Sequence, residues 1–393
     1  MPKSPATEGD SLFTVTVSSN GSELAETIEI VTVTITKAIN KIPTARIVIL
    51  DGDMPNQDFP ISNGTTLIPG AEIKITAGYD QNQSTIFQGI IVSQGIKITG
   101  DNYARLVIEC RDKAIGMTIG RKNANFLDAK DSDIISKLIG NYSGLSADVE
   151  TTQTQYKELV QYYCTDWDFL LSRAEVNGML VTVESGAVTV KPPQTSATPQ
   201  LKVTYGEDLI EFHAELDARA QFTSVTGTVW DQKTQGVLQQ QAGPKPFNAQ
   251  GDLDGGALAS VVGPATFRLQ TPVSMETTAL KAWADGQQMK SGLARIRGRM
   301  KFQGSAQATI GQLIELNGVG NRFNGNAFVS SITHDISGGN WITEAEFGLS
   351  PEWFAEQRNL VAPPASGFLP GVEGLHIGVV KKLDEDPEGE RSE

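Results

Sequence analysis

Short runs of alternating apolar and polar residues dominate the first hundred residues of the chain. FTVTVSS (13–19) and VTVTITK (31–37) place a hydrophobic residue at every second position, which lines one face of a β-strand. Further runs of this kind are separated by turn sequences such as DGD, SNG and TGDN. About six short strands over about 100 residues predict a β-barrel or sandwich, after a polar start that is expected to be poorly ordered.

The pattern changes after this region, where DAKDSDIISKLIGNYSGL (128–145) predicts a short helix. Asp131 or Ser132 would cap its start and Gly140 would end it. Its apolar stripe is formed by Ile134, Ile135, Leu138 and Ile139.

A second helix is predicted by TDWDFLLSRAEVNG (165–178). Thr165 can accept the first free amide, Asp168 stands three residues later, and Gly178 is a natural left-handed stop. A hairpin follows in MLVTVESGAVTVKPP (179–193). The residues that share the buried face of this helix are Trp167, Leu170, Leu171 and Ala174.

Strands resume after a polar linker, and TTALKAWADGQQMKSGLARIRGRMKFQG (277–304) predicts a further helix. The basic stretch RIRGRMK (295–301) is interpreted as the solvated end of that helix, with a basic patch as the alternative. Gly286 and Gly292 weaken the helical pattern. The residues expected to face inward are Leu280, Trp283, Met289, Leu293 and Ile296.

Two distant segments share a layout. IKITAGYDQNQSTIFQGIIVSQGI (73–96) and IELNGVGNRFNGNAFVSSITHDI (314–336) both read strand, glycine turn, short gap and second strand. Many β-hairpins share this layout, so the residues leave open whether the chain contains a structural duplication.

Composition narrows the classes of partner. The net charge of -14 should repel nucleic-acid phosphates and anionic membrane surfaces. The two cysteines, Cys110 and Cys164, lie in separate segments without a CxxC pair, which favours ordinary reduced thiols. There is no stretch of 18 apolar residues and no signal-peptide pattern, so neither stable membrane anchoring nor a cleaved leader is expected.

The cluster around Tyr162, Cys164 and Asp166 invites a catalytic interpretation, but no histidine lies near in sequence. Asp166 and Asp168 flank a helix start, where carboxylates answer free amides. The three histidines form no metal motif, and GVGNRFNG (318–325) lies between strands and does not match a phosphate-binding loop. The sequence therefore predicts no catalytic, cofactor-binding or metal residues and no cofactor.

The stretch QYYCTDWDFLLSRAEVNGML (161–180) resembles a signature of the VgrG spike-hub family of contractile injection systems. LARIRGRMKFQGSAQATIGQLIELNGVGNRFNGNAFVSSITHDIS (293–337) is similar to the second barrel region of that family, and the C-terminal stretch LPGVEGLHIGVVKKLDEDPEGE (369–390) is similar to its exit into an OB-fold. The closing stretch looks closest to phage-tail-like extracellular injection particles. The signature residues are Thr165, Asp166, Trp167, Asp168, Phe169, Leu170 and Gly178.

The resemblance implies a mainly β fold with α+β insertions, built around two related β-barrel hub domains. The expected domains are a flexible N-terminus (1–10), a first barrel (11–112), a helix-containing domain (113–197), a second barrel (198–230 and 300–350), an insertion with a helix (231–299), a linker (351–374) and the start of a truncated OB-fold (375–393).

The resemblance also implies a function. The chain would be the structural, non-enzymatic hub of a contractile injection system, a homotrimer that adapts a six-fold inner tube to a three-fold spike. Its partners would be the inner tube protein, other baseplate proteins, and a spike tip protein or effector cargo. It would assemble in the bacterial cytoplasm and then become part of an injection particle.

Two alternatives stay open. One is a type VI secretion tip or a phage baseplate hub of the same family. The other is an all-β protein that binds or cleaves carbohydrate, a class whose strands and five tryptophans fit loosely.

Overall fold

The computed structural model describes residues 2–5, 13–79, 82–100, 103–243, 248–263, 266–271 and 274–356. The chain divides into a large unit, Met1–Phe354, and a small unit, Ala355–Glu393. The small unit is described only where the 3-10 turn η3 (Phe354–Glu356) ends. Most of the predicted linker (351–374) and the whole predicted OB-fold start (375–393) lie outside the described residues.

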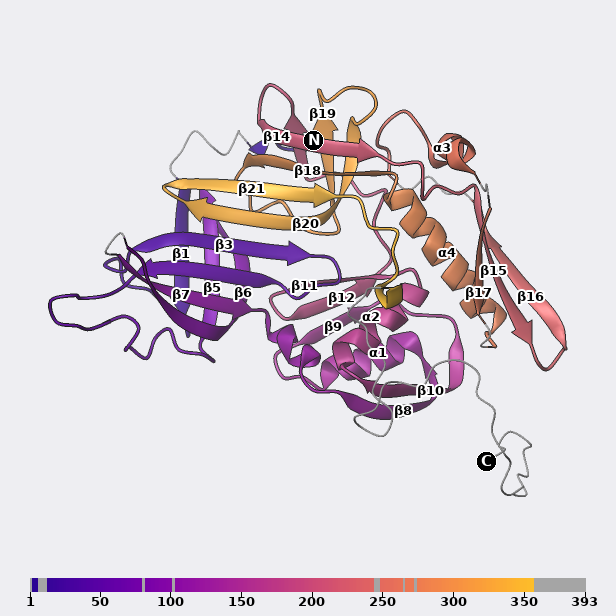
Figure 1. Cartoon of the computed structure of the whole chain (residues 1–393), viewed down its shortest axis with the longest axis horizontal. Coiled ribbons are helices and arrows are strands. Elements are labelled where there is room, and N and C mark those ends of the chain that lie inside the picture. Colours follow the sequence, from indigo (N-terminus) through magenta and orange to yellow (C-terminus); the bar gives the residue numbers. More distant parts are fainter. Residues whose placement is uncertain are drawn as a thin grey trace, which may run out of the picture. The chain divides into compact units, whose positions relative to one another are not determined.

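The large unit is mainly β, as predicted. Within the described ranges, thirteen strands form one sheet, and the order of its main path is β14-β18-β21-β20-β3-β4-β7-β6-β5-β1-β2. Figure 1 shows the C-terminal strands β20 and β21 lying beside the N-terminal strand β3. The strands are β1 (Phe13–Ser19), β2 (Ser22–Glu23), β3 (Ile30–Ala38), β4 (Thr44–Leu50), β5 (Glu72–Tyr79), β6 (Asn82–Ile98), β7 (Ala104–Arg111), β13 (Leu201–Thr204), β14 (Leu209–Leu216), β18 (Ile296–Gln303), β19 (Leu313–Asn317), β20 (Gly325–Ser337) and β21 (Asn340–Phe347).

This sheet contains the same strand path twice. The first lobe has the order β3-β4-β7-β6-β5-β1, and the second has the order β14-β18-β21-β20-β19-β13. The end strands differ in direction, because β1 is antiparallel to β5 whereas β13 is parallel to β19. The two segments that share a layout in the sequence are the hairpins β5–β6 and β19–β20, which occupy equivalent places. The chain therefore contains two related lobes.

Local details of the two hairpins agree as well. A glycine with positive φ precedes each first strand, Gly70 (φ 96) in one lobe and Gly311 (φ 76) in the other. Gly70 donates its amide to the carbonyl of Ile91, and Gly311 donates to that of Val329, both at 2.8 Å. A register shift then follows directly in both long strands. The agreement lets the lobes be aligned residue by residue.

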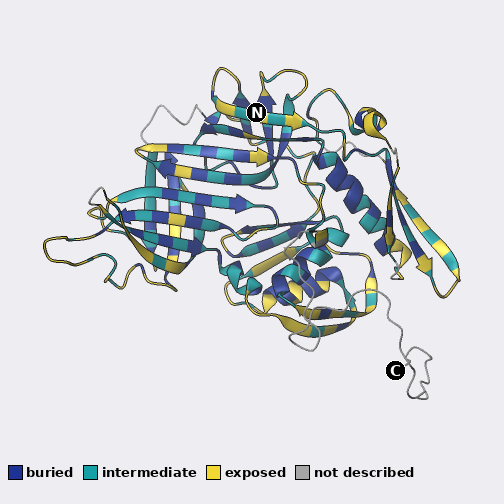
Figure 2. Ribbon diagram, in the orientation of Figure 1, coloured by how far each residue is buried: buried dark blue, intermediate teal, exposed yellow. Residues whose placement is uncertain are grey.

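Each lobe curls around its own hydrophobic core, and the cores meet at a pairing between lobes. β3 lies antiparallel to β20, with Ala38 opposite Ser331 and Thr32 opposite Ser337. Trp341 of β21 is 3% exposed and belongs to the core of the first lobe. Its ring stacks on that of Tyr79 at 5.6 Å between centroids. Figure 2 shows buried residues alternating with more exposed ones along β3, β20 and β21.

A helix-bearing region lies between the lobes in the sequence. Its helices α1 and α2 pack between the sheet β8–β10 and the sheet β11-β12-β9. The four predicted stripe residues of α1 are buried. Asp131 and Ser132 do not cap α1, because Lys130 holds the N-cap position and makes no side-chain bond there. The elements are η2 (Lys113–Thr118), β8 (Lys122–Lys130), α1 (Asp131–Gly140), β9 (Ser146–Val149), β10 (Gln155–Cys164), α2 (Asp166–Val176), β11 (Leu180–Glu184) and β12 (Ala187–Lys191).

A second insertion joins β14 to β18, where the first lobe has only a short turn between β3 and β4. Its helix α4 packs on β15 and β16. The predicted domain boundaries stay predictions. β15 pairs with β16 and β17 and therefore lies outside the second lobe, although residues 198–230 were expected to belong to that lobe. The elements are β15 (Ser224–Asp231), β16 (Gly236–Ala242), α3 (Gly255–Val262), β17 (Thr266–Thr271) and α4 (Thr277–Leu293).

One further local prediction is wrong. RIRGRMK is not a helix end, because α4 stops at Leu293 and Ile296 begins β18. In the described residues 2–5, the Lys3 amide donates to the Gln200 carbonyl at 3.1 Å and the Lys202 amide donates to the Lys3 carbonyl at 2.9 Å. The flexibility expected of residues 1–10 as a whole stays a prediction.

We expect the aromatic junction between the lobes to contribute strongly to stability. Trp341→Ala should lower the free energy of unfolding by about 3–5 kcal/mol, because it empties a buried site shared by both lobes. Trp230→Ala is the matched control, since Trp230 is 48% exposed. Urea denaturation of both variants measures the difference, and equal losses would contradict the junction's role.

Candidate functional site

The signature stretch forms the start of α2 in the way its residues predict. Thr165 has extended backbone angles, and its hydroxyl oxygen accepts the amide of Asp168 at 3.0 Å. Trp167, Phe169 and Leu170 are buried in the core of the helix-bearing region. The signature side chains therefore pack and cap the helix.

Asp166 is the polar centre of this cluster. Its side chain is 1% exposed, and one oxygen accepts from Lys122 at 2.7 Å and from the Tyr142 hydroxyl at 2.6 Å. The other oxygen accepts from Gln161 at 2.9 Å. Burial alone would raise the pKa of Asp166, but these hydrogen bonds outweigh it and hold that pKa below its ordinary value. The Asp166 carboxylate thus connects α2 to β8, to β10 and to Tyr142, which follows α1.

Arg173 makes a second tie inside the same region. Its guanidinium donates to both oxygens of Asp131, at 2.6 Å and 3.0 Å, and lies 5.0 Å from the centre of the Tyr156 ring. Asn177 also donates to Asp131, at 2.8 Å. Asp131 was predicted to cap α1, but its buried carboxylate instead joins α1 to α2.

Gly178 brings α2 against α4. Its φ is 65°, which suits the predicted left-handed stop. A Cβ on Gly286 would lie 3.1 Å from the Gly178 Cα and 3.3 Å from the Glu175 carbonyl oxygen. Gly286, which weakens the helical pattern in the sequence, is therefore needed for this close approach. A glycine inside an otherwise good helix was the only sequence signal for this contact.

Glu175 contacts both α4 and the segment that follows β21. One of its oxygens accepts from Lys290 of α4, and the other accepts the Phe354 amide at 2.7 Å. Lys290 lies 4.7 Å from the centre of the Trp353 ring and donates to the Glu352 carbonyl at 2.5 Å. We call this group, Glu175, Lys290, Trp353 and Phe354, the exit clamp. The sequence patterns did not point to Lys290 or Trp353, because the contacts join residues far apart in the chain.

Cys164, Cys110 and His334 lie in environments that favour their neutral forms. Burial raises the pKa of the Cys164 thiol, and Asp168 and Asp166 raise it further. Burial raises the pKa of Cys110 to about 12. Burial also lowers the pKa of His334 to about 3, and its ring bonds Thr343 at 3.0 Å. His376 lies outside the described residues.

The described ranges also contain no group of three or more His, Cys, Asp or Glu that could hold a metal ion. None of the helices within them is both long and apolar enough to cross a membrane.

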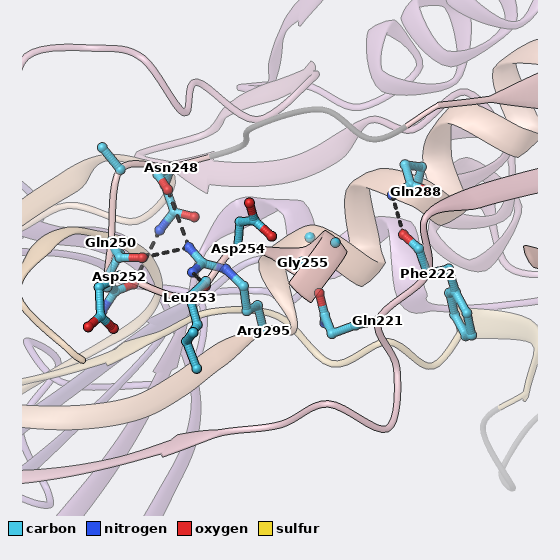
Figure 3. A pocket seen from close by; sticks show the side chains of 14 residues that line it. Gln221, Phe222, Asn248, Gln250, Asp252, Leu253, Asp254, Gly255, Gln288 and Arg295 are labelled. Atoms are coloured by element: carbon cyan, nitrogen blue, oxygen red, sulfur yellow. Dashed lines mark hydrogen bonds between the residues drawn. The ribbon is translucent and has the colours of Figure 1, made fainter. Parts of the chain in front are cut away.

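A pocket of about 420 Å³ lies where residues 248–256 face α4 (Figure 3). The Arg295 guanidinium points into it but donates to main-chain carbonyls, at 2.7 Å for Gln250 and also to Leu253. Burial lowers the pKa of Arg295, although Asp254 opposes this effect. Gln288 donates to the Phe222 carbonyl at 3.1 Å. Arg295 therefore holds the loop in place.

The second lobe has an exposed apolar edge. A hollow of about 320 Å³ lies along β14. It is lined by Tyr205, Leu209, Ile210, Phe212, Gly318 and Val319. In the first lobe, the end of β6 exposes Ile96 (50%) and Ile98 (69%). Exposed apolar side chains at unpaired strand edges are candidate protein-binding surfaces.

The contact between α2 and α4 can be tested with Gly286→Ala. The new Cβ should push the two backbones apart and lower the free energy of unfolding by about 1–3 kcal/mol, although alanine favours a helix. Gly140→Ala in α1 is the matched control, because its Cβ would meet nothing within 4 Å. If thermal melting shows Gly286→Ala to be as stable as this control, the contact does not constrain the fold.

The Asp166 network should make stability depend on pH. The pKa of Asp166 is lowered in the folded state, so its bonds stabilise the fold above the unfolded-state pKa of about 3.9 and are lost as pH falls through the folded-state pKa. Asp166→Asn should cost about 2–3 kcal/mol near neutral pH, and the gap to the unmodified chain should narrow below about pH 3.9.

Urea denaturation across a pH series checks this expectation. Asp148→Asn is the control, since the Asp148 carboxylate is 61% exposed in its ion pair with Lys191 and should change stability by less than about 1 kcal/mol. A gap for Asp166→Asn that stays constant at every pH would contradict the proposed linkage.

Solved structures resemble the chain over most of its length. A tail protein from Neisseria meningitidis MC58 has a TM-score of 0.63 and 15% identity, covering 87% of this chain and 98% of its own. The 43 kDa tail protein of prophage MuSo2 from Shewanella oneidensis has a TM-score of 0.62 and 12% identity. The match covers 86% of this chain and 98% of the tail protein.

An E. coli protein described as a component of the type VI secretion system, structurally similar to the T4 bacteriophage tail proteins gp27 and gp5, has a TM-score of 0.57. It is 10% identical, and the match covers 88% of this chain and 81% of its own. The fold is thus one found in phage tail and type VI secretion proteins.

No curated protein matches the sequence. A sequence model of one family, described as the Alg8 N-terminal domain, matches residues 9–338. The chain belongs to the Alg8 N-terminal domain family.

Proposed function

We propose that this chain is the structural hub of a contractile injection system, similar to VgrG proteins. The duplicated lobe is the observation that carries the proposal. One chain supplies two copies of the same six-strand path, so a homotrimer supplies six. The six similar lobes give such a ring near six-fold symmetry, which matches an inner tube. Its three identical chains give it exact three-fold symmetry, which matches a spike.

The fold supports this role. Its likeness to phage tail proteins and to a type VI secretion component extends over more than four fifths of each chain. In the proposed role the partners are the inner tube protein, other baseplate proteins, and a spike tip protein or effector cargo. The hub assembles in the bacterial cytoplasm and is driven into the target when the sheath contracts.

The proposed role is mechanical and needs no catalysis. The buried carboxylates Asp131 and Asp166 are both engaged in ion pairs within the helix-bearing region, and the Cys164 thiol has a raised pKa. We therefore propose a non-enzymatic protein. The similarity to both prophage tail proteins and a type VI component keeps a phage baseplate hub and a type VI secretion tip as alternative machines for the same role.

Native mass spectrometry tests the hub proposal. The chain has a mass of 42.2 kDa, so a trimer should appear at about three times this mass. Electron microscopy of the same sample should show a ring with six similar lobes. A species that stays monomeric up to high micromolar concentration would contradict the hub, and selective binding on a glycan array would then favour a carbohydrate-binding protein.

A further inference from the structure

One pairing inside the chain serves as a template for a contact between chains. Within one chain, β3 of the first lobe adds to the edge of β20 in the second lobe. The strand equivalent to β3 is β14, and the strand equivalent to β20 is β6. In the described part of the chain, β14 pairs only with β18, and the end of β6 pairs only with β7.

The equivalence of β14 and β3 holds at single-residue level. β3 shifts register against β4 between Ile30 and Thr32, and β14 shifts against β18 between Leu209 and Glu211. Aligning these two shifts places Phe212 where the first lobe has Val33. It also places Glu215 where the first lobe has Thr36.

The equivalence of β6 and β20 rests on a second pair of shifts. β6 shifts against β7 between Ile91 and Ser93, and β20 shifts against β21 between Val329 and Ser331. Ile96 then corresponds to His334. By the same alignment, Gly95 corresponds to Thr333 and Ile98 corresponds to Ile336.

Residues of β3 and β20, which pair with each other, are more buried than their counterparts in β14 and β6, which have no neighbouring strand on that edge in the described part of the chain. Val33 and Ile35 of β3 are fully buried, whereas their counterparts in β14 are only partly buried. His334 and Ile336 of β20 are 2% and 7% exposed. Their counterparts in β6, Ile96 and Ile98, are 50% and 69% exposed. The paired copy of each edge is covered, and the unpaired copy is not.

We infer that β14 of one copy of this chain pairs antiparallel with the end of β6 in a neighbouring copy. This inference rests on the proposed homotrimer. The register transfers from β3 and β20, where Thr36 faces Thr333 and Val33 faces Ile336. It places Gly95 opposite Glu215 and Ile98 opposite Phe212. Each copy offers one edge of each kind, so the contact runs head to tail and closes a ring.

The two edges are suited to each other. The transferred register brings Ile98 to Phe212, which lines the hollow of about 320 Å³ along β14. The apolar side chain of Ile98 would therefore be buried against Phe212, which is favourable because it removes apolar surface from water. Glu215 of β14 already pairs with Arg297 at 2.9 Å, and Lys97 of β6 would lie diagonally across from it, so the added strand brings no like charge to this carboxylate. An added strand also satisfies the backbone groups that an edge leaves open.

A disulfide tests the register directly. In the template pair, the hydroxyl oxygens of Thr36 and Thr333 lie 3.3 Å apart, so side chains at this position are in reach of each other. Gly95→Cys combined with Glu215→Cys, in a Cys164→Ser background, should therefore cross-link neighbouring copies under mild oxidation. Cys110 is fully buried and stays in place.

The expected product is a covalent trimer on a non-reducing gel. Mass spectrometry should identify a disulfide-linked peptide pair that joins position 95 of one copy to position 215 of the next. The matched control combines Gly95→Cys with His213→Cys, which is two residues out of register. Two residues along a strand is a shift of about 7 Å, so this pair should cross-link at least about tenfold less.

A second variant tests the contact without a disulfide. Ile96→Asp changes a half-exposed side chain, so a single copy should keep its melting temperature while the trimer is lost in native mass spectrometry. Val237→Asp on β16 is the control, because Val237 is 56% exposed and β16 belongs to a different sheet from β14 and β6. It should stay trimeric.

The outcomes separate this inference from the hub proposal. A trimer in which Gly95→Cys and Glu215→Cys fail to cross-link, and which Ile96→Asp leaves intact, overturns the strand pairing but keeps the hub. An unmodified chain that stays monomeric overturns both. A disulfide that joins position 215 of one copy to position 215 of another would show a two-fold contact between β14 strands and would also overturn the pairing.

Discussion

The backbone ladder between β3 and β20 is the interaction on which the rest of the chain depends. It joins residues nearly three hundred positions apart and makes two curled lobes into one sheet. Because of it, Trp341 of the second lobe is buried in the core of the first, and Ile39, just after β3, is buried in the core of the second. The helix-bearing region and the insertion both fill connections within this frame.

The alternation of side chains predicted most strands, because a half-buried strand must alternate whatever its partners are. The start of α2 was predictable for a similar reason, since Thr165 and Asp168 make a local contact. β18 was missed although Ile296, Met300 and Phe302 alternate with charged residues in it. The helical pattern of the preceding residues continues into them without a break in the sequence, and Gly298 gives no local sign that it packs against Phe347.

Contacts between distant segments could not be predicted from the sequence. Nothing near Glu175 indicates Lys290, and nothing near Gly178 indicates Gly286, because both contacts form only when α2 meets α4. The duplication lies between these extremes. Its two hairpins were similar enough to notice, but only the shared strand order and the shared register shifts distinguish a duplication from two ordinary hairpins.

The exit clamp determines how the chain would carry a mechanical load. A pull on the chain beyond Glu356 would first reach Trp353 and Phe354, which are held by Glu175 and Lys290. The load would then pass into α2 and α4, whose contact at Gly178 and Gly286 leaves little room to slide. It would reach β21 only afterwards. Tension would therefore reach the contact between α2 and α4 before it reached the paired strands of the two lobes.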